Sequence, residues 1–253
     1  MTMPIPLADR LKWWIYPGIN LHARLRYQRI PIHFSPSAMN QSCRTLDAGS
    51  GNGMLAYQAW KKGARVIGVS FKASEVLGAR RLFNGFRKIP ESDLRFIEGN
   101  LYALEFPDNS FDAIICSETL EHLRHDDAVC RAFWRLLKPG GVLHLCAPNA
   151  DHPYNVSFPL DPEERGGHVR PGYTLSSWQA LLAPIGFQIQ VTEGLGGPVR
   201  QFFNRHIKET QERYGAWAGL PLFVLSQICL PFERRSAEAQ SPFSIYVQAI
   251  KPG

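Results

Sequence analysis

The chain has 253 residues, of which 45% are hydrophobic and 20% are charged, and its formal net charge is +6. This composition excludes an intrinsically disordered chain and supplies enough apolar surface for one substantial core. The five cysteines are odd in number, widely spaced and without a CxxC pair, so they predict neither a disulfide framework nor a metal site.

The excess positive charge lies in two flanking segments. Residues 1–36 hold five Lys or Arg against one Asp, and residues 199–235 hold six against three acidic residues. Both segments are unusually apolar, and neither contains a dense Lys/Arg stripe or an RNA-binding module, so we expect no nucleic-acid partner. The first 14 residues lack the pattern of a signal peptide, which predicts a cytoplasmic protein with reduced thiols.

The N-terminal segment combines tryptophans and tyrosines with arginines between residues 11 and 30. We predict that residues 1–41 form a basic, aromatic helical cap, which either covers a pocket or contacts a membrane interface. From residue 44 onward, apolar runs alternate with segments of helical periodicity. The runs that predict strands span residues 44–49, 65–70, 93–99, 111–117, 142–148, 187–194 and 243–250. The segments that predict helices span residues 52–63, 73–88, 127–141 and 174–186.

Continuous apolar strands alternating with helices indicate a parallel sheet covered on both faces. The predicted fold class is therefore α/β, a doubly wound, mostly parallel and seven-stranded sheet in one Rossmann-like domain over residues 42–253. Two segments interrupt this alternation of strands and helices. Residues 151–173 are rich in Pro, Gly and His and predict a loop or lid.

The second interruption, residues 197–240, is predicted to be an apolar and basic helical insertion. Its apolar run, residues 216–232, contains two prolines and falls short of the ~20 apolar residues that cross a bilayer. We predict a helix packed on the sheet; the alternative is an apolar lid or a patch for peripheral membrane contact.

The strand-to-helix turn "LDAGSGNG" carries glycines at alternate positions and Asp47 at the strand end. Glycines allow close approach of a ligand, and the following helix N-terminus offers N–H groups. A dinucleotide fingerprint requires a glycine where this chain has Met54. The charge of Asp47 repels a pyrophosphate and favours a cationic ligand, such as the aminoacyl end of S-adenosylmethionine.

Two further motifs follow this turn in order: "EGNLYALEFPDNSFDAIICSETLEHL" and "LLKPGGVLHLCAP". With these motifs, the chain resembles the class I S-adenosylmethionine-dependent methyltransferases with small-molecule and lipid acceptors, over about residues 42–150. The resemblance implies a sheet whose last strand is antiparallel and S-adenosyl-L-methionine as the cofactor. The cofactor-binding residues that it implies are Asp47, Gly49, Ser50, Gly51, Ser70, Phe71, Asn100, Leu101 and Ser117.

Two of these positions depart from the family pattern, because Ser70 and Asn100 stand where acids normally bind the ribose and the adenine amine. Neutral hydrogen bonds in place of charge-assisted ones weaken cofactor binding by about 1 to 3 kcal/mol. Glu75 or Ser74 is expected to help hold the ribose, and the alternative is that Ser70 only caps the next helix. Phe71 and Leu101 are expected to pack against adenine, although each also suits the core.

Methyl transfer to a hydroxyl requires removal of a proton, for which histidine is suited. The predicted catalytic residues are His122, in the Glu-His-Leu pattern, with His168 and Tyr173 in the loop or lid; packing and helix capping are the alternatives. Glu118 and Glu121 are expected to satisfy nearby backbone groups or counter-charges.

The predicted function is methyl transfer to a small or amphiphilic acceptor, at the oxygen of a lipid-linked molecule, a glycolipid or a natural product. A non-catalytic binding module with the same fold is the alternative. A third interpretation is an NADP-dependent reductase, in which Ser70 and Lys72 accept a 2′-phosphate. This last interpretation leaves Asp47 unexplained.

Overall fold

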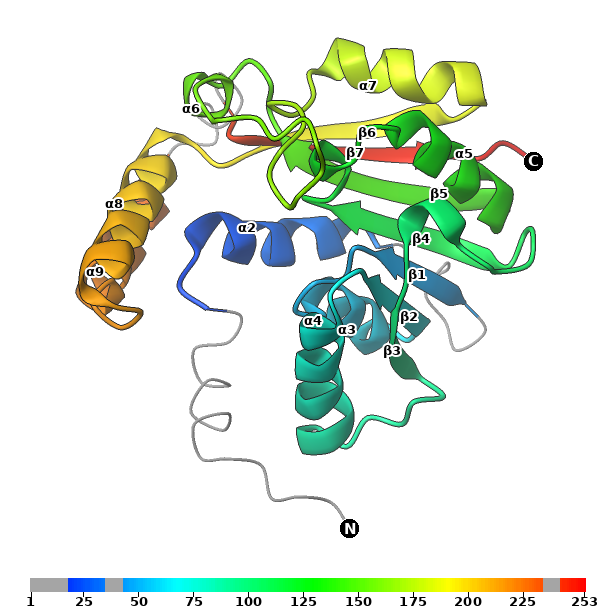
Figure 1. The fold of residues 1–253 in the computed structure, drawn as a ribbon, viewed down its shortest axis with the longest axis horizontal. Helices are drawn as coiled ribbons and strands as arrows, with labels where there is room; N and C mark the ends of the chain where they lie inside the picture. Colours follow the sequence, from blue (N-terminus) through cyan, green and yellow to red (C-terminus); the bar gives the residue numbers. More distant parts are fainter. Residues whose placement is uncertain (1–17, 35–42, 234–241) are drawn as a thin grey trace.

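The computed structural model describes residues 18–34, 43–233 and 242–253. Residues 1–17 and 35–41 of the predicted cap, and residues 234–240 of the predicted insertion, lie outside the described residues. Seven strands form one sheet in the order β3-β2-β1-β4-β5-β7-β6 (Figure 1). The strands are β1 Arg44–Ala48, β2 Arg65–Ser70, β3 Leu94–Glu98, β4 Phe111–Ser117, β5 Leu137–Pro148, β6 Gln188–Leu195 and β7 Ser244–Ile250.

Strands β1 to β5 pair in parallel, and β7 lies antiparallel between β5 and β6. This arrangement confirms the predicted fold class and the antiparallel last strand. The helices that connect the strands are α3 Met54–Lys61, α4 Ala73–Ala79, α5 Asp126–Leu136, α6 Pro153–Val156 and α7 Leu175–Leu182.

Two helices differ from their predicted extents. After Ala79, α4 continues as a π-helical segment, Arg80–Phe86. Helix α5 ends at Leu136, before the glycines that were expected to close it, because Leu137 already pairs with Phe111 in the sheet.

Each strand face contributes to a separate layer of the core, as the alternation of side chains along a strand requires. In β4, Ile114 and Cys116 pack with α5 and α7 on one face. Ala113 and Ile115 pack on the opposite face with residues of α2, α3 and α4. The sheet is therefore covered on both sides, which leaves the carboxyl ends of the parallel strands as the edge where loops gather.

Helix α2, Leu21–Arg29, begins at Asn20, whose side chain accepts a hydrogen bond from the backbone N–H of Ala23 (2.9 Å). It is followed by a 3₁₀ turn, Ile30–His33. The backbone N–H of Leu21 donates to Asn204 Oδ1 (2.8 Å), so α2 is tied to α8, which spans Pro198–Tyr214. Helix α2 also contacts the glycine turn after β1, through the hydrogen bond from Tyr27 to Asn52. This position fits the prediction that the N-terminal segment covers a pocket.

Helix α8 forms a hairpin with α9, Leu220–Cys229, and the hairpin stands away from the sheet (Figure 1). Helix α9 packs on α8, so the predicted helix packed on the sheet is wrong. Its sequence is apolar on all sides and therefore did not indicate which surface it meets. Several of its large apolar side chains and those beside it are exposed: Trp217, Leu220, Val224, Leu225, Ile228 and Phe232. Among the described residues, the helices are all too short or too polar to cross a bilayer.

The predicted loop or lid, residues 151–173, folds back on the carboxyl end of β4. Its backbone N–H at Val169 donates to the carbonyl of Glu121 (2.8 Å), and Leu160 and His168 form a β-bridge within it. At its end, Tyr173 bridges to Asn149, next to β5. These contacts place the segment beside the site described below.

Candidate functional site

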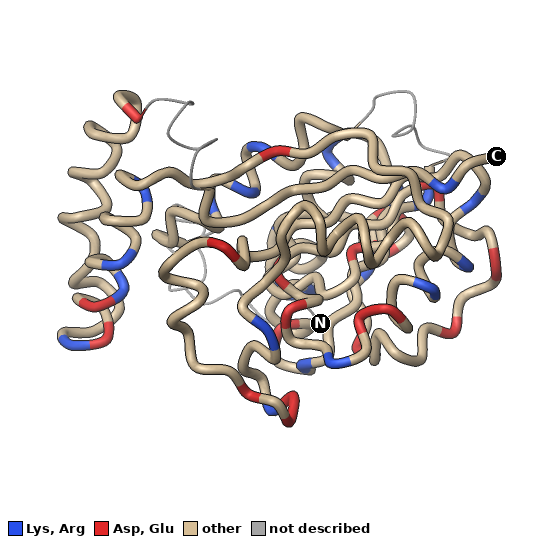
Figure 2. The backbone as a smooth tube through the Cα atoms, turned by 90° about the horizontal axis from the view of Figure 1, so that it is seen from above, with Lys and Arg blue, Asp and Glu red and all other residues tan. Residues whose placement is uncertain are grey.

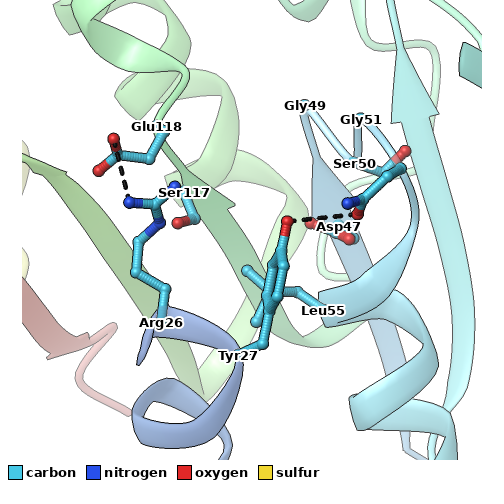
Figure 3. A pocket seen from close by; sticks show the side chains of 10 residues that line it. Arg26, Tyr27, Asp47, Gly49, Ser50, Gly51, Leu55, Ser117 and Glu118 are labelled. Carbon is cyan, nitrogen blue, oxygen red and sulfur yellow. Dashed lines mark hydrogen bonds and ion pairs between the residues drawn. The ribbon is translucent and has the colours of Figure 1, made fainter. Parts of the chain in front are cut away.

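A cavity of about 210 Å³ lies at the carboxyl ends of β1 and β4, beneath α2 (Figure 3). Its walls come from three elements that are far apart in the sequence: α2, the glycine turn after β1, and the end of β4. The lining residues are Arg26, Tyr27, Asp47, Gly49, Ser50, Gly51, Asn52, Leu55, Ser117 and Glu118. Asp47, the predicted glycines of the turn and Ser117 therefore do meet at one site.

The turn has its shape because Gly49 adopts a φ of +81° and packs closely against β4. A Cβ at this position lies 2.2 Å from Thr119 Oγ1, which only glycine avoids. The backbone N–H groups of Gly49 and Ser50 both donate to the carbonyl of Val69. These two groups therefore hold the turn against β2.

Asp47 lies at the floor of this cavity and is 2% exposed. Its Oδ2 accepts a hydrogen bond from the backbone N–H of Ala56 (2.9 Å). Burial raises the pKa of Asp47 to about 7, because a single hydrogen bond compensates little of the lost hydration. A cationic ligand in the cavity supplies the missing counter-charge and favours the ionised carboxylate.

Arg26 and Glu118 form the charged wall opposite Asp47 (Figure 3). The Arg26 Nη1 and Glu118 Oε2 atoms are 3.4 Å apart, and both side chains are largely buried. This pairing confirms that Glu118 meets a counter-charge. The cavity thus holds two acidic groups and one guanidinium, a set that suits a zwitterionic ligand end.

Sequence reasoning did not identify Arg26 or Tyr27 as lining residues. Both lie on α2, about 20 residues before the glycine turn, and their approach depends on how α2 docks. The hydroxyl of Tyr27 donates to Asn52 Oδ1 (3.3 Å), which connects α2 directly to the turn. The mixture of aromatic and basic residues was the only local signal for a cap.

A second, larger cavity of about 420 Å³ continues from the first, because both share Gly49, Gly51 and Glu118. It extends over the ends of β2 and β3 and reaches residues of the loop or lid. The further lining residues are Val69, Ser70, Phe71, Lys72, Glu75, Asn100, Leu101, Tyr102, Thr119, His122, Leu123, Glu164 and Gly166.

A carboxylate lies close to the end of β2. The hydroxyl of Ser70 donates to the carboxylate of Glu75, which lies in the first turn of α4. Both residues line the larger cavity. The carboxylate at this edge of the cavity therefore comes from the helix and not from the strand.

The end of β3 contributes Asn100 and Leu101 to the same cavity, opposite Phe71. Phe71 is 77% exposed and Leu101 is 8% exposed, so Phe71 belongs to the cavity wall and not to the core. The Oδ1 of Asn100 accepts a hydrogen bond from the backbone N–H of Tyr102 (3.0 Å). This oxygen, which was expected to face adenine, caps the following turn.

The three predicted catalytic residues occupy different environments. His122 lines the larger cavity, and the ring of His168 packs edge-on against it, with centroids 4.7 Å apart. Tyr173 is 3% exposed and stacks on Trp178. Its hydroxyl donates to Asp126 Oδ2 (2.6 Å), so a catalytic role for Tyr173 does not fit its position in the core.

Glu121 also differs from its expected role. Its side chain is fully buried, and neither carboxylate oxygen has a hydrogen-bond partner among the described residues. Burial raises the pKa of Glu121 well above its ordinary value. Of the two roles expected for this carboxylate, a hydrogen bond to a backbone group is not seen among the described residues, and the counter-charge is limited to His122, whose Nε2 lies 4.0 Å from Oε1.

Residues 46–145 match the family model of the methyltransferase domain. This segment contains β1, β2, β3 and β4, most of β5, and the residues that line both cavities except those of α2 and of the loop or lid.

This part of the chain is similar to the methyltransferase domain. Curated relatives that the chain resembles include the ubiquinone biosynthesis O-methyltransferases of Xanthomonas oryzae pv. oryzae and Xanthomonas campestris pv. campestris, each 36% identical over 149 residues. The match covers 56% of this chain and 58% of each relative. It therefore spans little more than half the length of these relatives.

Solved structures with the same fold cover almost all of this chain. A putative sarcosine dimethylglycine methyltransferase from Galdieria sulphuraria superposes with a TM-score of 0.66 at 15% identity, over 97% of both chains. The [4+2]-cyclase SpnF superposes with a TM-score of 0.59 at 21% identity, over 97% of this chain and 82% of that one. At these identities the likeness shows the fold alone.

Proposed function

We propose that this methyltransferase binds S-adenosylmethionine across the two joined cavities and transfers the methyl group to an oxygen of a small or amphiphilic acceptor. The observation that carries the proposal is the division of the cleft at the glycine turn. One part is small and charged, and the other is larger and lined by Phe71 and Leu101. This division corresponds to the two chemically different ends of the cofactor.

In the smaller cavity, the methionyl carboxylate pairs with the Arg26 guanidinium, and the ammonium group lies between Asp47 and Glu118. In the larger cavity, Glu75 and Ser70 accept the ribose hydroxyls, and the adenine ring contacts Phe71. A carboxylate at the ribose position repels a 2′-phosphate, which argues against the NADP-dependent reductase.

The sulfonium is already activated, so the protein has to align three atoms and exclude water. A bond forms between the acceptor oxygen and the methyl carbon as the carbon–sulfur bond breaks, and the electron pair of that bond stays on sulfur. The hydroxyl proton must leave the acceptor. We assign this activation to the cavity edge at His122, whose imidazole lines this wall.

An aromatic or lipid-linked hydroxyl is the acceptor class that we favour. Similarity to ubiquinone biosynthesis O-methyltransferases supports an oxygen acceptor. The exposed apolar side chains of α9 support an amphiphilic one, because an exposed patch of this kind marks an interaction surface.

Calorimetric titration with S-adenosylhomocysteine tests the cofactor site, and we expect saturable binding of one equivalent. Incubation with S-adenosylmethionine and a catechol then tests transfer, with formation of the methyl ether followed by mass spectrometry. Absence of binding contradicts the proposal. Binding without turnover on any phenolic, carboxylic or lipid-extract acceptor favours the non-catalytic binding module.

We also propose that the hairpin of α8 and α9 contacts a membrane surface. Helix α9 has no charged residue, whereas α8 carries Lys and Arg together with Glu (Figure 2). An apolar face next to basic groups suits the interface of an anionic bilayer.

Flotation with phosphatidylglycerol vesicles tests this membrane contact. We expect wild type to float and the Val224→Asp/Ile228→Asp variant to remain in the lower fraction. Equal behaviour of the two proteins contradicts membrane contact through α9.

A further inference from the structure

Three metal-ligating side chains meet at the wall of the larger cavity. Glu121 and His122 lie in the 3₁₀ turn after β4, and His168 comes from the loop or lid. One carboxylate oxygen and one nitrogen from each ring all lie within 4.8 Å of one another. Two imidazoles and a carboxylate are the donor set of many divalent zinc and iron sites.

The buried carboxylate of Glu121 gives the first independent indication of a cation. It is fully buried, and neither oxygen has a hydrogen-bond partner in the described part of the chain. The nearest guanidinium groups are committed elsewhere: Arg26 pairs with Glu118, and Arg170 pairs with Asp126. Leaving a buried carboxylate without a partner is costly, unless a proton or a cation compensates it.

The hydrogen bonding of His122 gives the second indication. Its Nδ1 lies 2.8 Å from the carbonyl of Gly167, so Nδ1–H donates to this oxygen. The Nε2 lone pair is then left facing Glu121 Oε1, 4.0 Å away. A metal-binding histidine commonly has its second nitrogen fixed in this way by a backbone carbonyl.

The loop or lid holds His168 in place through its own backbone. The carbonyl of His168 accepts from the N–H of Asp161 (2.7 Å), and the next residue, Val169, donates to the carbonyl of Glu121 (2.8 Å). The rings of His122 and His168 are adjacent, with their centroids 4.7 Å apart.

The spacing of the three groups suits a small divalent ion. With bonds of about 2.0 to 2.2 Å and tetrahedral angles, two ligands of one zinc ion lie roughly 3.3 to 3.6 Å apart. The three ligand atoms, which lie within 4.8 Å of one another, therefore have to approach by at most roughly 1.5 Å, which we expect from rotation of the side chains.

We propose that Glu121, His122 and His168 bind one divalent metal ion of the zinc class, with an open coordination position facing the larger cavity. The second part of the inference rests on the proposed function. There, the acceptor hydroxyl binds at the open position, and the metal lowers its pKa so that its proton leaves to water. The oxyanion then attacks the methyl carbon, and the electron pair of the broken carbon–sulfur bond stays on sulfur. His122 then activates the acceptor as a ligand of the metal.

Metal binding is tested without cofactor or acceptor, so its outcome is independent of the proposed methyl transfer. Untagged protein is treated with a chelator, dialysed and titrated with Co²⁺, followed by visible absorption, and with Zn²⁺ by calorimetry. We expect one equivalent to bind, and we expect Glu121→Gln and His168→Ala to weaken binding at least tenfold. His125→Ala is the matched control, because this exposed histidine lies three residues from His122.

Binding of S-adenosylhomocysteine by each variant serves as the check that the fold is retained. The inference is overturned if wild type binds no equivalent of Co²⁺ or Zn²⁺, or if the His125 control loses binding as strongly as the other variants. If metal binds but methyl transfer is equal in metal-free and metal-loaded protein, the site stands and its role in acceptor activation is excluded.

Discussion

At the scale of single residues, we propose that Glu75 takes the place of the acid that the family pattern has at the end of β2. Its carboxylate accepts from Ser70 and lines the larger cavity. We expect Glu75→Gln to raise the Kd of S-adenosylhomocysteine about tenfold, because a charge-assisted hydrogen bond to the ribose becomes a neutral one. Calorimetry measures this, and Glu91→Gln, at an exposed turn, is the control. An unchanged Kd in the Glu75 variant rules out this role.

Asp47 predicts a pH dependence of cofactor binding. Its pKa is raised to about 7, so below pH 7 the carboxyl is protonated and must ionise before it pairs with the cationic ligand. The affinity for S-adenosylhomocysteine should therefore fall by up to about tenfold per pH unit below 7 and level off above it. Titrations between pH 5.5 and 8.5 test this. In the Asp47→Asn variant, the affinity should no longer fall below pH 7. If the variant has the same pH profile as wild type, Asp47 is not the group that causes the fall.

The sequence predicted the glycine turn, Asp47 and Ser117 because the signals for a strand, a turn and a helix start are local. It did not predict that Asn100 caps a turn or that Tyr173 enters the core. The position of Tyr173 depends on Asp126, which lies 47 residues away along the chain, whereas Asn100 accepts from the N–H of Tyr102 in a local turn for which Asn is a common residue. Arg26 was missed for the same reason as Tyr173, since its role depends on the docking of α2.

At the scale of elements, α8 positions α2 over the smaller cavity without lining it. The N–H of Leu21 donates to Asn204 on α8, and Arg26 follows on the same helix. We expect Asn204→Ala to raise the Kd of S-adenosylhomocysteine about three- to tenfold, because the loss of one hydrogen bond loosens α2. Lys208→Ala, one turn further along α8 and exposed, is the matched control. Equal affinities for both variants and wild type mean that α8 does not hold the cap.

The strands and most of the helices were predictable because apolar runs bounded by glycine are local patterns. The place of α9 was not predictable, since a helix that is apolar on all sides has no face that indicates its neighbour. In the structure it packs on α8, and its remaining apolar side chains stay exposed.

At the scale of the whole molecule, buried histidines predict a loss of stability in mild acid. Burial lowers the pKa of His22 and of His144 to about 3, from an ordinary value of 6.5. Their contribution is fully present above pH 6.5 and is lost as the pH falls toward 3. Asp47 and Glu121 act in the opposite direction, because their raised pKa values favour the folded state on acidification, whereas His168, whose pKa burial lowers to about 4, adds to the loss.

We expect the free energy of unfolding to fall by at least about 1 kcal/mol per pH unit between pH 6 and 5, as measured by urea titration. In His22→Gln the slope should be smaller by about 1.4 kcal/mol per pH unit, since one titrating group is removed. His125→Gln, an exposed position, should keep the slope of wild type. A His22 variant with the slope of wild type contradicts this explanation.

The most direct test of the whole account is a crystal structure of the protein with S-adenosylhomocysteine. We expect the carboxylate of the ligand at Arg26, its ammonium group between Asp47 and Glu118, and its ribose at Glu75. A ligand bound elsewhere, or an Arg26–Glu118 ion pair that still fills the smaller cavity while the ligand is excluded, contradicts the account.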